Sequence, residues 1–478
     1  MLSVMDDDDY NLEVLGYKPS FRREFSNLAT ISFAFRILGL CSSIAMTFNT
    51  PLLLGGPASA TWCWLLGSCL CFTLGSSIAE IVSAFPTCGG LYTASAQLCP
   101  LSHRAIVGWI VGWLSILGQT AGLASSEFGV ANMILAAVTI ASPSFEITQG
   151  KTVGLFTGLL ITHGTLNSIA TKYLAFYARG FVFVNLGATI VIIIVLLATT
   201  PRSEMHTASY VFGSLGIINQ TGGWNTGIAF LFGLLNDCVS YFLDYDATAH
   251  ISEEVRRAAY AAPSAIFIAV IGTGILGWIL TIVLVLCSGN MHSKDLPGVS
   301  GSAFLQIMVL RMGTPVALFL WSFVCLTGFF VVQTGLQAGS RTFYAFSRDH
   351  GFLDLASPIA ANAIFALTAM ALDLSYIIPI FLRRVYGNHP EVQFKPVFSL
   401  PTVLPVTKEN MNYAAIITVG VIVLSGLWYI LGSHRHYHGP TSNLEGKAGT
   451  KLGTNEARPT NALRVDIPEK HMEQDYVA

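Results

Sequence analysis

The sequence predicts an all-α bundle of helices that crosses a membrane many times. Of the 478 residues, 53% are hydrophobic and only 11% are charged, whereas ordinary soluble domains are about 25% charged. No single soluble core buries that much apolar surface, so the bundle must face lipid. A charge at the centre of a spanning helix costs roughly 2.5–3.5 kcal/mol, so charges inside apolar stretches mark a partner, a cavity or a ligand.

Ten stretches are apolar and long enough to cross a bilayer, which takes about 20 residues. We expect residues 1–25 to form a cytosolic tail, 26–432 the transmembrane domain and 433–478 a second cytosolic tail. The predicted spans are 27–52, 57–84, 104–124 (continuing to 141), 151–170, 180–199, 226–247, 262–287, 314–340, 358–382 and 412–432.

Basic residues orient the bundle, because cytosolic loops carry an excess of Lys and Arg. The loops on the amino-terminal side hold ten such residues and the opposite loops hold four. Both termini are therefore expected in the cytosol. The protein is expected in the plasma membrane rather than the vacuolar membrane. Asn219 begins an Asn-Gln-Thr triplet in the loop after the fifth span, which this orientation places outside as a glycosylation site.

The charge pattern fails near the end of the chain. Arginines flank the span 358–382 on both sides, so both of its ends favour the cytosol although one crossing separates them. These arginines are Arg341, Arg348, Arg383 and Arg384. Two helices are therefore predicted to be missing, one near Asp354 and one near Val397. The alternative is that this span tolerates arginines outside.

The first span has the composition of a helix that breaks at its midpoint. Gly39 allows unusual backbone angles, and Ser42 and Ser43 follow it. In transporters built from broken helices, the N–H groups freed at the start of a half-helix bind a substrate carboxylate. The alternative is an ordinary packing face of small residues, which is common in membrane helices.

The sixth span carries carboxylates beside aromatic rings, a combination that suits an amine or quaternary ammonium ion through charge pairing and cation–π contact. We expect Tyr241, Phe242, Asp244 and Tyr245 to bind substrate. Alternatively, the aspartates of this span pair within the bundle and never meet a ligand. These aspartates are Asp237, Asp244 and Asp246.

Arg36 lies about 15 Å into the first span, at 1.5 Å per residue. It either pairs with Asp237 or Asp244, binds an anionic group, or is a damaging variant. We expect a buried ion pair. The remaining charge within an apolar stretch is Asp373, in the span 358–382.

Glutamates also lie at the cytosolic ends of two spans, Glu80 after the second and Glu253 and Glu254 after the sixth. We expect them to form an inner gate with arginines of the cytosolic loops rather than to touch a ligand. Gln119 and Asn185 either line the path or hydrogen-bond between helices.

Enzyme motifs are absent from the sequence: there is no GxSxG, no HExxH and no phosphate-binding glycine loop. The nine cysteines have neither a zinc spacing nor a secreted disulfide pattern. His103, His163 and His250 are isolated along the chain and are interpreted as structural. We expect no cofactor and no metal, and the net charge of -2 gives no reason to expect a nucleic-acid partner.

Four ordered motifs resemble the fungal amino acid/choline permease family of the amino acid–polyamine–organocation superfamily, which includes γ-aminobutyrate and choline permeases. The resemblance covers about residues 15 to 440. The motifs are Glu80 to Tyr92 (EIVSAFPTCGGLY), His250 to Glu254 (HISEE), Ser340 to Asp349 (SRTFYAFSRD) and Pro405 to Tyr413 (PVTKENMNY).

The resemblance implies twelve spans, ten of them in two inverted five-helix repeats. It implies a secondary transporter that moves an amino acid or related amine by alternating access, with a co-transported proton or sodium ion. Helix nine of the family is missing between Asp354 and Ser357, and helix eleven between Lys395 and Leu400. A truncated splice product without transport activity, acting as a regulatory or non-functional membrane protein, is therefore the alternative.

The chain also departs from the family at single positions. Family members have a small or polar residue at Arg36 and an aromatic residue near Ser240, so the gating aromatic here is expected to be Tyr241 or Phe242. Some relatives couple to protons through a lysine in the fifth span, where this chain has Asn185 as its nearest polar residue. The coupling ion therefore stays open.

Overall fold

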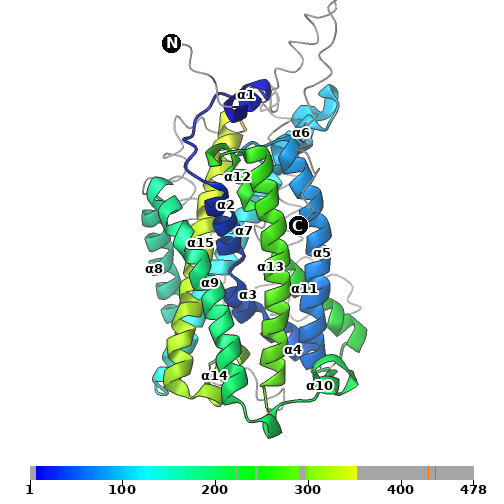
Figure 1. Cartoon of the computed structure of the whole chain (residues 1–478), viewed down its shortest axis with the longest axis vertical. Coiled ribbons are helices and arrows are strands. Elements are labelled where there is room, and N and C mark those ends of the chain that lie inside the picture. The colour runs from blue at the N-terminus through cyan, green and yellow to red at the C-terminus, as the bar shows by residue number, and fades with distance from the viewer. Residues whose placement is uncertain are drawn as a thin grey trace, which may run out of the picture.

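The computed structural model describes residues 7–168, 171–221, 223–242, 246–289, 298 and 300–351, together with Tyr429 and Tyr437. Within these ranges the chain is helical, and the one β-type pairing is an isolated bridge between Phe25 and Val255. The predicted all-α bundle is confirmed, and Figure 1 shows its long helices running side by side. The helices are α1 (Asp7–Val14), α2 (Asn27–Leu38), α3 (Leu40–Thr47), α4 (Asn49–Gly55), α5 (Pro57–Ala84), α6 (Leu91–Gln97), α7 (Leu101–Ala141), α8 (Gln149–Asn167), α9 (Thr171–Thr199), α10 (Ala208–Phe212), α11 (Thr226–Phe242), α12 (Ala247–His250), α13 (Ala258–Leu286), α14 (Ala303–Met312) and α15 (Thr314–Arg348), with short 3-10 turns η1 (Arg202–Glu204), η2 (Ser214–Gly216) and η3 (Ser252–Glu254).

Eight of the ten predicted spans coincide with helices of the described chain. Among them, the span 151–170 corresponds to α8 and the span 226–247 to α11. The third span continues to Ala141, as predicted. The last two predicted spans, Asp373 and both predicted gaps lie outside the described residues. Six segments in the described ranges are long and apolar enough to cross a membrane: Asn27–Gly55, Pro57–Ala84, Ser102–Ala141, Phe181–Thr199, Ala258–Leu286 and Thr314–Arg348.

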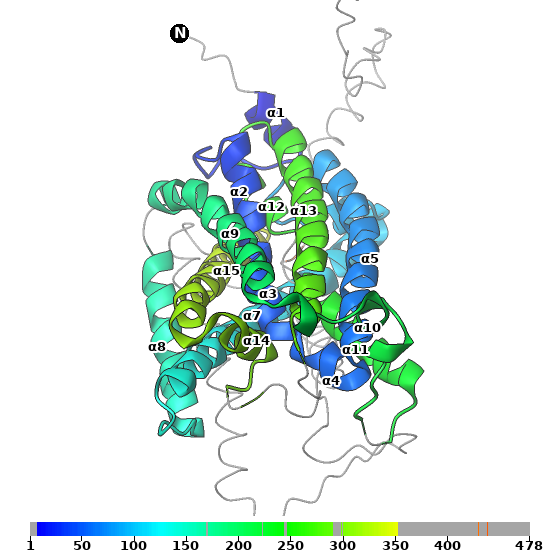
Figure 2. The ribbon, with the colours of Figure 1, turned by 60° about the horizontal axis from the view of Figure 1, so that its bottom comes forward.

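The first of these segments, which contains α2, α3 and α4, is the centre of the bundle. Of its most apolar stretch, 83% is buried, against 33% to 56% for the other five. The helix α2 packs against α9, α13 and α15, and Figure 2 shows α2 and α3 between α9 and α13. Because this helix faces protein nearly all round, its irregular backbone is sheltered from lipid, as broken helices in membranes require.

The central helix breaks at Gly39, as predicted. Gly39 adopts φ 44° and ψ 59°, ending α2 and beginning α3. A side chain at this position would be strained by the left-handed backbone, and its Cβ would overlap Val331 of α15. Glycine is therefore required both by the backbone angles and by the close approach of α15.

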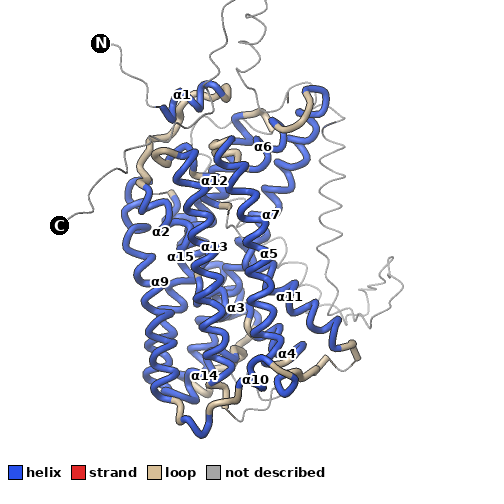
Figure 3. Tube along the Cα trace, turned by 45° about the vertical axis from the view of Figure 1, so that its right-hand side comes forward, coloured by secondary structure: helices blue, strands red, loops and turns tan. Residues whose placement is uncertain are grey.

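The two ends of the bundle differ. Helices α1, α6 and α12 lie at one end, named here the α1 end, and α4, α10 and α14 lie at the other, named the α14 end (Figures 1 and 3). At the α1 end, Asp8 of α1 accepts hydrogen bonds from the backbone N–H groups of Arg257 (2.6 Å) and Ala258 (3.2 Å), where α13 begins. Part of the segment predicted as a tail is thus packed onto the bundle.

Candidate functional site

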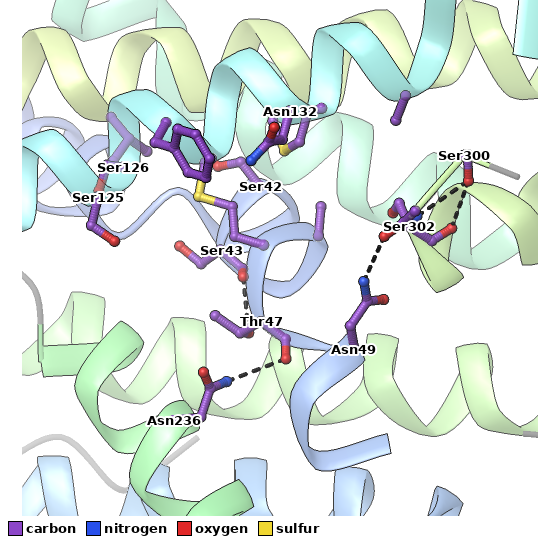
Figure 4. A pocket seen from close by; sticks show the side chains of 18 of the residues that line it. Ser42, Ser43, Thr47, Asn49, Ser125, Ser126, Asn132, Asn236, Ser300 and Ser302 are labelled. Carbon is purple, nitrogen blue, oxygen red and sulfur yellow. Dashed lines mark hydrogen bonds between the residues drawn. The ribbon is translucent and has the colours of Figure 1, made fainter. Parts of the chain in front are cut away.

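A cavity of about 530 Å³ lies beside the break in the central helix. Its wall comes from α2, α3, α4, α7, α11, α15 and the loop before α14, so it extends toward the α14 end. The described residues that line it carry no ionisable side chain. Its polar wall, shown in Figure 4, consists of Ser42, Ser43, Thr47, Asn49, Ser125, Ser126, Asn132, Asn236, Ser300 and Ser302.

Two serines at the start of α3 line this cavity. The hydroxyl of Ser42 donates to the carbonyl of Gly39 (2.8 Å), and that of Ser43 donates to the carbonyl of Leu38 (2.7 Å). The two serines thus satisfy carbonyls freed at the end of α2. The N–H groups in the first turn of α3 have no acceptor within the helix, and this end of the helix dipole favours negative charge.

The polar wall divides into side chains that hold the helices together and side chains that face open space. Asn49 donates to the carbonyl of Gly301 (2.8 Å) and accepts from the N–H of Ala303 (2.9 Å), which ties α4 to the start of α14. On the α7 wall, by contrast, the side chains of Ser125 and Asn132 are exposed. They are available to a ligand.

The predicted residues of the sixth span are only partly covered by the structure. The helix α11 ends at Phe242 and α12 begins at Ala247. Tyr241 belongs with Phe242 to the last turn of α11, but the positions of both side chains lie outside what is described. Asp244 and Tyr245 also lie outside the described residues, so their role in binding stays a prediction.

Arg36 does not pair with Asp237. Its side chain is buried, its Nε donates to the hydroxyl of Thr334 on α15, and its guanidinium lies 5.9 Å and 5.8 Å from the ring centroids of Phe33 and Phe330. Asp237 is buried too, but it neither lines the cavity nor contacts Arg36 in the described part of the chain. In the described part of the chain, two aromatic faces and a hydroxyl lie against the cation. Asp244 lies outside the described residues, so its pairing with Arg36 stays a prediction.

An ion-pair network, here called the closing network, fills the α1 end. Glu253 of η3 pairs with Arg348 at 3.0 Å, and Glu254 pairs with Arg341. Both arginines come from the last two turns of α15. Asp349, which follows α15, accepts hydrogen bonds from the hydroxyls of Tyr17 (3.0 Å) and Tyr92 (2.9 Å). The network therefore joins the amino-terminal segment, α6, η3 and α15.

Burial and charge shift the pKa values within the closing network. Burial raises the pKa of Asp349 to about 6, although Arg348 and the two tyrosine hydroxyls oppose this. Burial also acts to raise the pKa of Glu253. The positive charge of Arg348 and the hydrogen bonds from Arg348 and Cys88 outweigh this effect of burial, so the pKa of Glu253 lies below its ordinary value. Glu253 is thus held as a carboxylate, whereas Asp349 can take up a proton near neutral pH.

Glu80 lies outside the closing network. Its side chain is exposed and lies with Ser83 and Pro263 in a groove between α5 and α13. The structure brings Glu253 and Glu254 against arginines, as expected for them, but it leaves Glu80 apart because its position near the end of α5 turns outward.

Gln119 and Asn185 each form a hydrogen bond between two helices. The Nε2 atom of Gln119 is 2.8 Å from Nε2 of His250. The amide of Asn185 donates to the carbonyl of Phe35 at 3.0 Å, just before the break in the central helix. Neither residue lines the cavity. Of the two roles considered for them, the structure therefore shows hydrogen bonding between helices.

One buried pair escaped the sequence argument altogether. His163 of α8 lies against Glu127 of α7, 2.9 Å from Nδ1 to the nearer carboxylate oxygen, and both side chains are fully buried. Glu127 lies inside the long apolar stretch of α7, so a complete search for acids in spans would have found it. Its partner could not be found that way, because His163 belongs to the next span.

Comparison with known proteins agrees with this architecture. Residues 28–358 match the family described as amino acid permease. An uncharacterized amino-acid permease of Schizosaccharomyces pombe is 36% identical, over 92% of this chain and 91% of the relative. Amino-acid permease 2 of Neurospora crassa is 33% identical, over 92% of this chain and 90% of the relative. The GABA-specific permease of Saccharomyces cerevisiae is 27% identical, over 91% and 86%.

Among solved structures, a nucleobase-cation-symport-1 family transporter in a closed conformation with bromovinylhydantoin bound gives a TM-score of 0.48. Its sequence is 10% identical, over 77% of this chain and 78% of that chain.

A membrane bundle whose broken central helix borders a polar cavity is a carrier rather than an enzyme. The family match covers more than two thirds of the sequence. The chain belongs to the amino acid permease family, and it is a secondary transporter of amino acids. The predicted family resemblance and function class are confirmed.

Proposed function

We propose that the cavity beside Gly39 is the substrate site and that it holds a small amino acid or related amine. The observation that carries this proposal is the neutral wall of hydroxyls and amides around the start of α3. The N–H groups of the first turn of α3 suit a carboxylate. γ-Aminobutyrate fits this arrangement better than choline, because choline has no carboxylate. The GABA-specific permease among the relatives supports the same choice.

The ammonium group of the substrate needs acceptors on the opposite side of the cavity. The described wall offers neutral oxygens on α7, such as those of Asn132 and Ser125. We assign Asp244 of the sixth span as the charged partner, with Tyr241, Phe242 and Tyr245 beside it, because carboxylates and aromatic rings both attract alkylammonium ions.

We also propose that this conformation faces outward. The cavity extends to the loop before α14, whereas the α1 end is filled by the closing network. The positive-inside rule places the α1 end in the cytosol, since Arg23, Arg256 and Arg257 lie there with Arg341 and Arg348. Glu253 and Glu254 then act as the inner gate. On the same argument Asn219 lies outside, and the plasma membrane is the proposed location.

The predicted loss of two helices would favour a second candidate function, that of a non-transporting membrane partner. The comparison with the Schizosaccharomyces pombe relative extends over 504 aligned positions, but 92% of the 478 residues is about 440 residues. About 64 positions of the relative therefore have no counterpart here. That is the length of two spanning helices with their loops, at about 20 residues per helix.

Counterflow in proteoliposomes tests the proposed function. Purified chain is reconstituted in vesicles loaded with unlabelled amino acid, and entry of labelled γ-aminobutyrate, glutamate, lysine and choline is measured without any ion gradient. We expect rapid exchange of at least one amino acid, and weaker exchange when Asn132→Ala removes an amide from the wall. An absence of exchange for every compound, in vesicles that contain monodisperse protein, would favour the non-transporting partner.

A further inference from the structure

The pair of His163 and Glu127 lies where three helices meet. Nδ1 of His163 is 3.1 Å from Oε1 and 2.9 Å from Oε2 of Glu127, on α7. Nε2 of His163 is 2.9 Å from the backbone carbonyl of Phe329, on α15, and the centroids of the two rings are 4.1 Å apart, with their planes tilted by 38°. Both side chains are fully buried. Two ionisable groups thus lie against each other inside a membrane bundle.

The contacts determine how many protons the pair holds. A carbonyl oxygen only accepts, so Nε2 of His163 must carry a hydrogen. The second hydrogen bond, between Nδ1 and the carboxylate, then needs one further proton, held by either group. With this proton the pair is neutral overall and every contact is a hydrogen bond. Without it, a carboxylate faces a nitrogen lone pair and the site carries a buried negative charge, which is costly.

In the described part of the chain, the polar side chains that neighbour the pair on α8 and α15 are neutral. They are Asn167 and Gln333, which are 3.5 Å apart. From α2, the buried cation Arg36 reaches α15 at Thr334, a few residues beyond Phe329. The proton between Nδ1 and the carboxylate is therefore part of a buried hydrogen-bond arrangement, which entry of water or separation of the helices would expose.

The pair is also mechanically connected to the substrate cavity. Ser126 and Phe128, on either side of Glu127, line the cavity. On α15, Val331 lines the cavity and packs on Gly39, two residues after Phe329. A movement of α7 or α15 around a bound substrate would therefore alter the contacts that hold the proton.

We propose that the His163–Glu127 pair is the binding site of a proton carried together with the substrate, which rests on the transport function proposed above. A proton delivered by hydronium outside forms one N–H or O–H bond within the pair, while one O–H bond of the hydronium breaks and water is released. After the carrier turns inward, the same proton leaves to water. One positive charge thus accompanies each zwitterionic substrate.

The test compares two assays on the same proteoliposomes. Counterflow without gradients reports substrate binding and alternating access. Accumulation driven by an acidic exterior, with the membrane potential clamped by potassium and valinomycin, reports proton coupling. The central variant is Glu127→Gln, which keeps a hydrogen-bonding group of the same shape but does not ionise. The matched control is Glu146→Gln, the same chemical change at an exposed glutamate of the α7–α8 loop.

We expect the unaltered chain to accumulate substrate on acidification and to carry protons inward with it, seen with a trapped pH dye. Glu127→Gln should lose at least tenfold in gradient-driven accumulation while its counterflow stays within about twofold, and Glu146→Gln should resemble the unaltered chain. His163→Gln provides a second variant with the same expectation.

Three results would overturn the proton site. The first is accumulation by Glu127→Gln as strong as that of the unaltered chain. The second is accumulation by the unaltered chain with a sodium gradient but not with a proton gradient. The third is loss of counterflow in both the glutamate and the histidine variant, which would show a structural pair. A failure of counterflow in the unaltered chain itself would instead refute the transport function.

Discussion

At the scale of single residues, Gly39 has the strictest requirement in the site. It combines a left-handed backbone with the approach of Val331, and it begins α3, whose Ser42 and Ser43 line the cavity. We expect Gly39→Ala to reduce counterflow at least tenfold and to destabilise the protein by about 1–3 kcal/mol, the typical cost of a strained backbone conformation. Initial rates of exchange and the thermal melting of the purified protein measure the two effects.

A matched glycine provides the control for this substitution. Gly118 lies within α7, and a Cβ there would meet nothing within 4 Å. Gly118→Ala should leave exchange unchanged and slightly favour the helix, by up to about 1 kcal/mol. If both alanine variants behaved alike, the close approach at Gly39 would be irrelevant to transport.

Arg36 shows what residue-scale inference from sequence misses. The charge and its depth in the first span are evident from the sequence, and the expectation of a carboxylate partner follows from electrostatics. In the structure, Thr334 and two phenylalanine rings surround the guanidinium. Sequence spacing does not reveal the contacts with Thr334 and Phe330, because these residues come from a helix some 300 residues away.

At the scale of elements, α15 connects the functions of the molecule. Its middle lines the cavity and contacts His163, and its last turns carry the arginines of the closing network. A long rigid helix of this kind transmits a shift at one end to the other. The closing network therefore provides a direct test of inner gating.

We expect Glu253→Gln to open the α1 end. Removing one partner of a buried ion pair typically costs about 3–5 kcal/mol, because the other charge stays buried, and Arg348 would lose its main carboxylate. Cys88, whose N–H donates to Glu253 at 3.0 Å, is buried beneath this pair. Its alkylation by N-ethylmaleimide, followed by peptide mass spectrometry, should accelerate at least tenfold.

Glu80→Gln is the matched control for the gate, since Glu80 is exposed and lies outside the closing network. It should leave the alkylation of Cys88 unchanged. Equal protection of Cys88 in the Glu253 variant and in the unaltered chain would show that this ion pair does not hold the α1 end closed.

The closing network should also respond to pH through Asp349. Its pKa is about 6 in the closed form, above the ordinary 3.8. The raised pKa means that protonation of Asp349 favours the closed form. The resulting stabilisation of the closed form is complete below about pH 4 and is lost as the pH rises through about 6. Protection of residues 7–17 from hydrogen exchange, corrected for the intrinsic rate, should fall over that window.

Asp349→Asn removes this titration. In that variant the protection should vary little between pH 4 and pH 7, apart from the contribution of other groups. A pH dependence equal to that of the unaltered chain would assign the response to a group other than Asp349.

At the scale of the whole molecule, the predicted loss of two helices bears on whether this chain works alone. Restoring the roughly 64 missing positions from the Schizosaccharomyces pombe relative, at the predicted gaps near Asp354 and Lys395, should raise exchange at least tenfold if they encode two helices. Insertion of a polar linker of equal length is the control. Equal exchange by the chain with and without the restored segments would show that the shortened bundle is complete for transport.

Much of the architecture was predictable from composition and periodicity alone. Apolar stretches of sufficient length must become spanning helices, because lipid leaves backbone polar groups no other partner, and Gly39 with its serines indicated a break. Those are local properties. The partners of Arg36, the isolation of Glu80 and the pairing of His163 with Glu127 depend on which helices lie side by side and how each is rotated. Such contacts join residues that are distant in the chain, so only the packed bundle decides them.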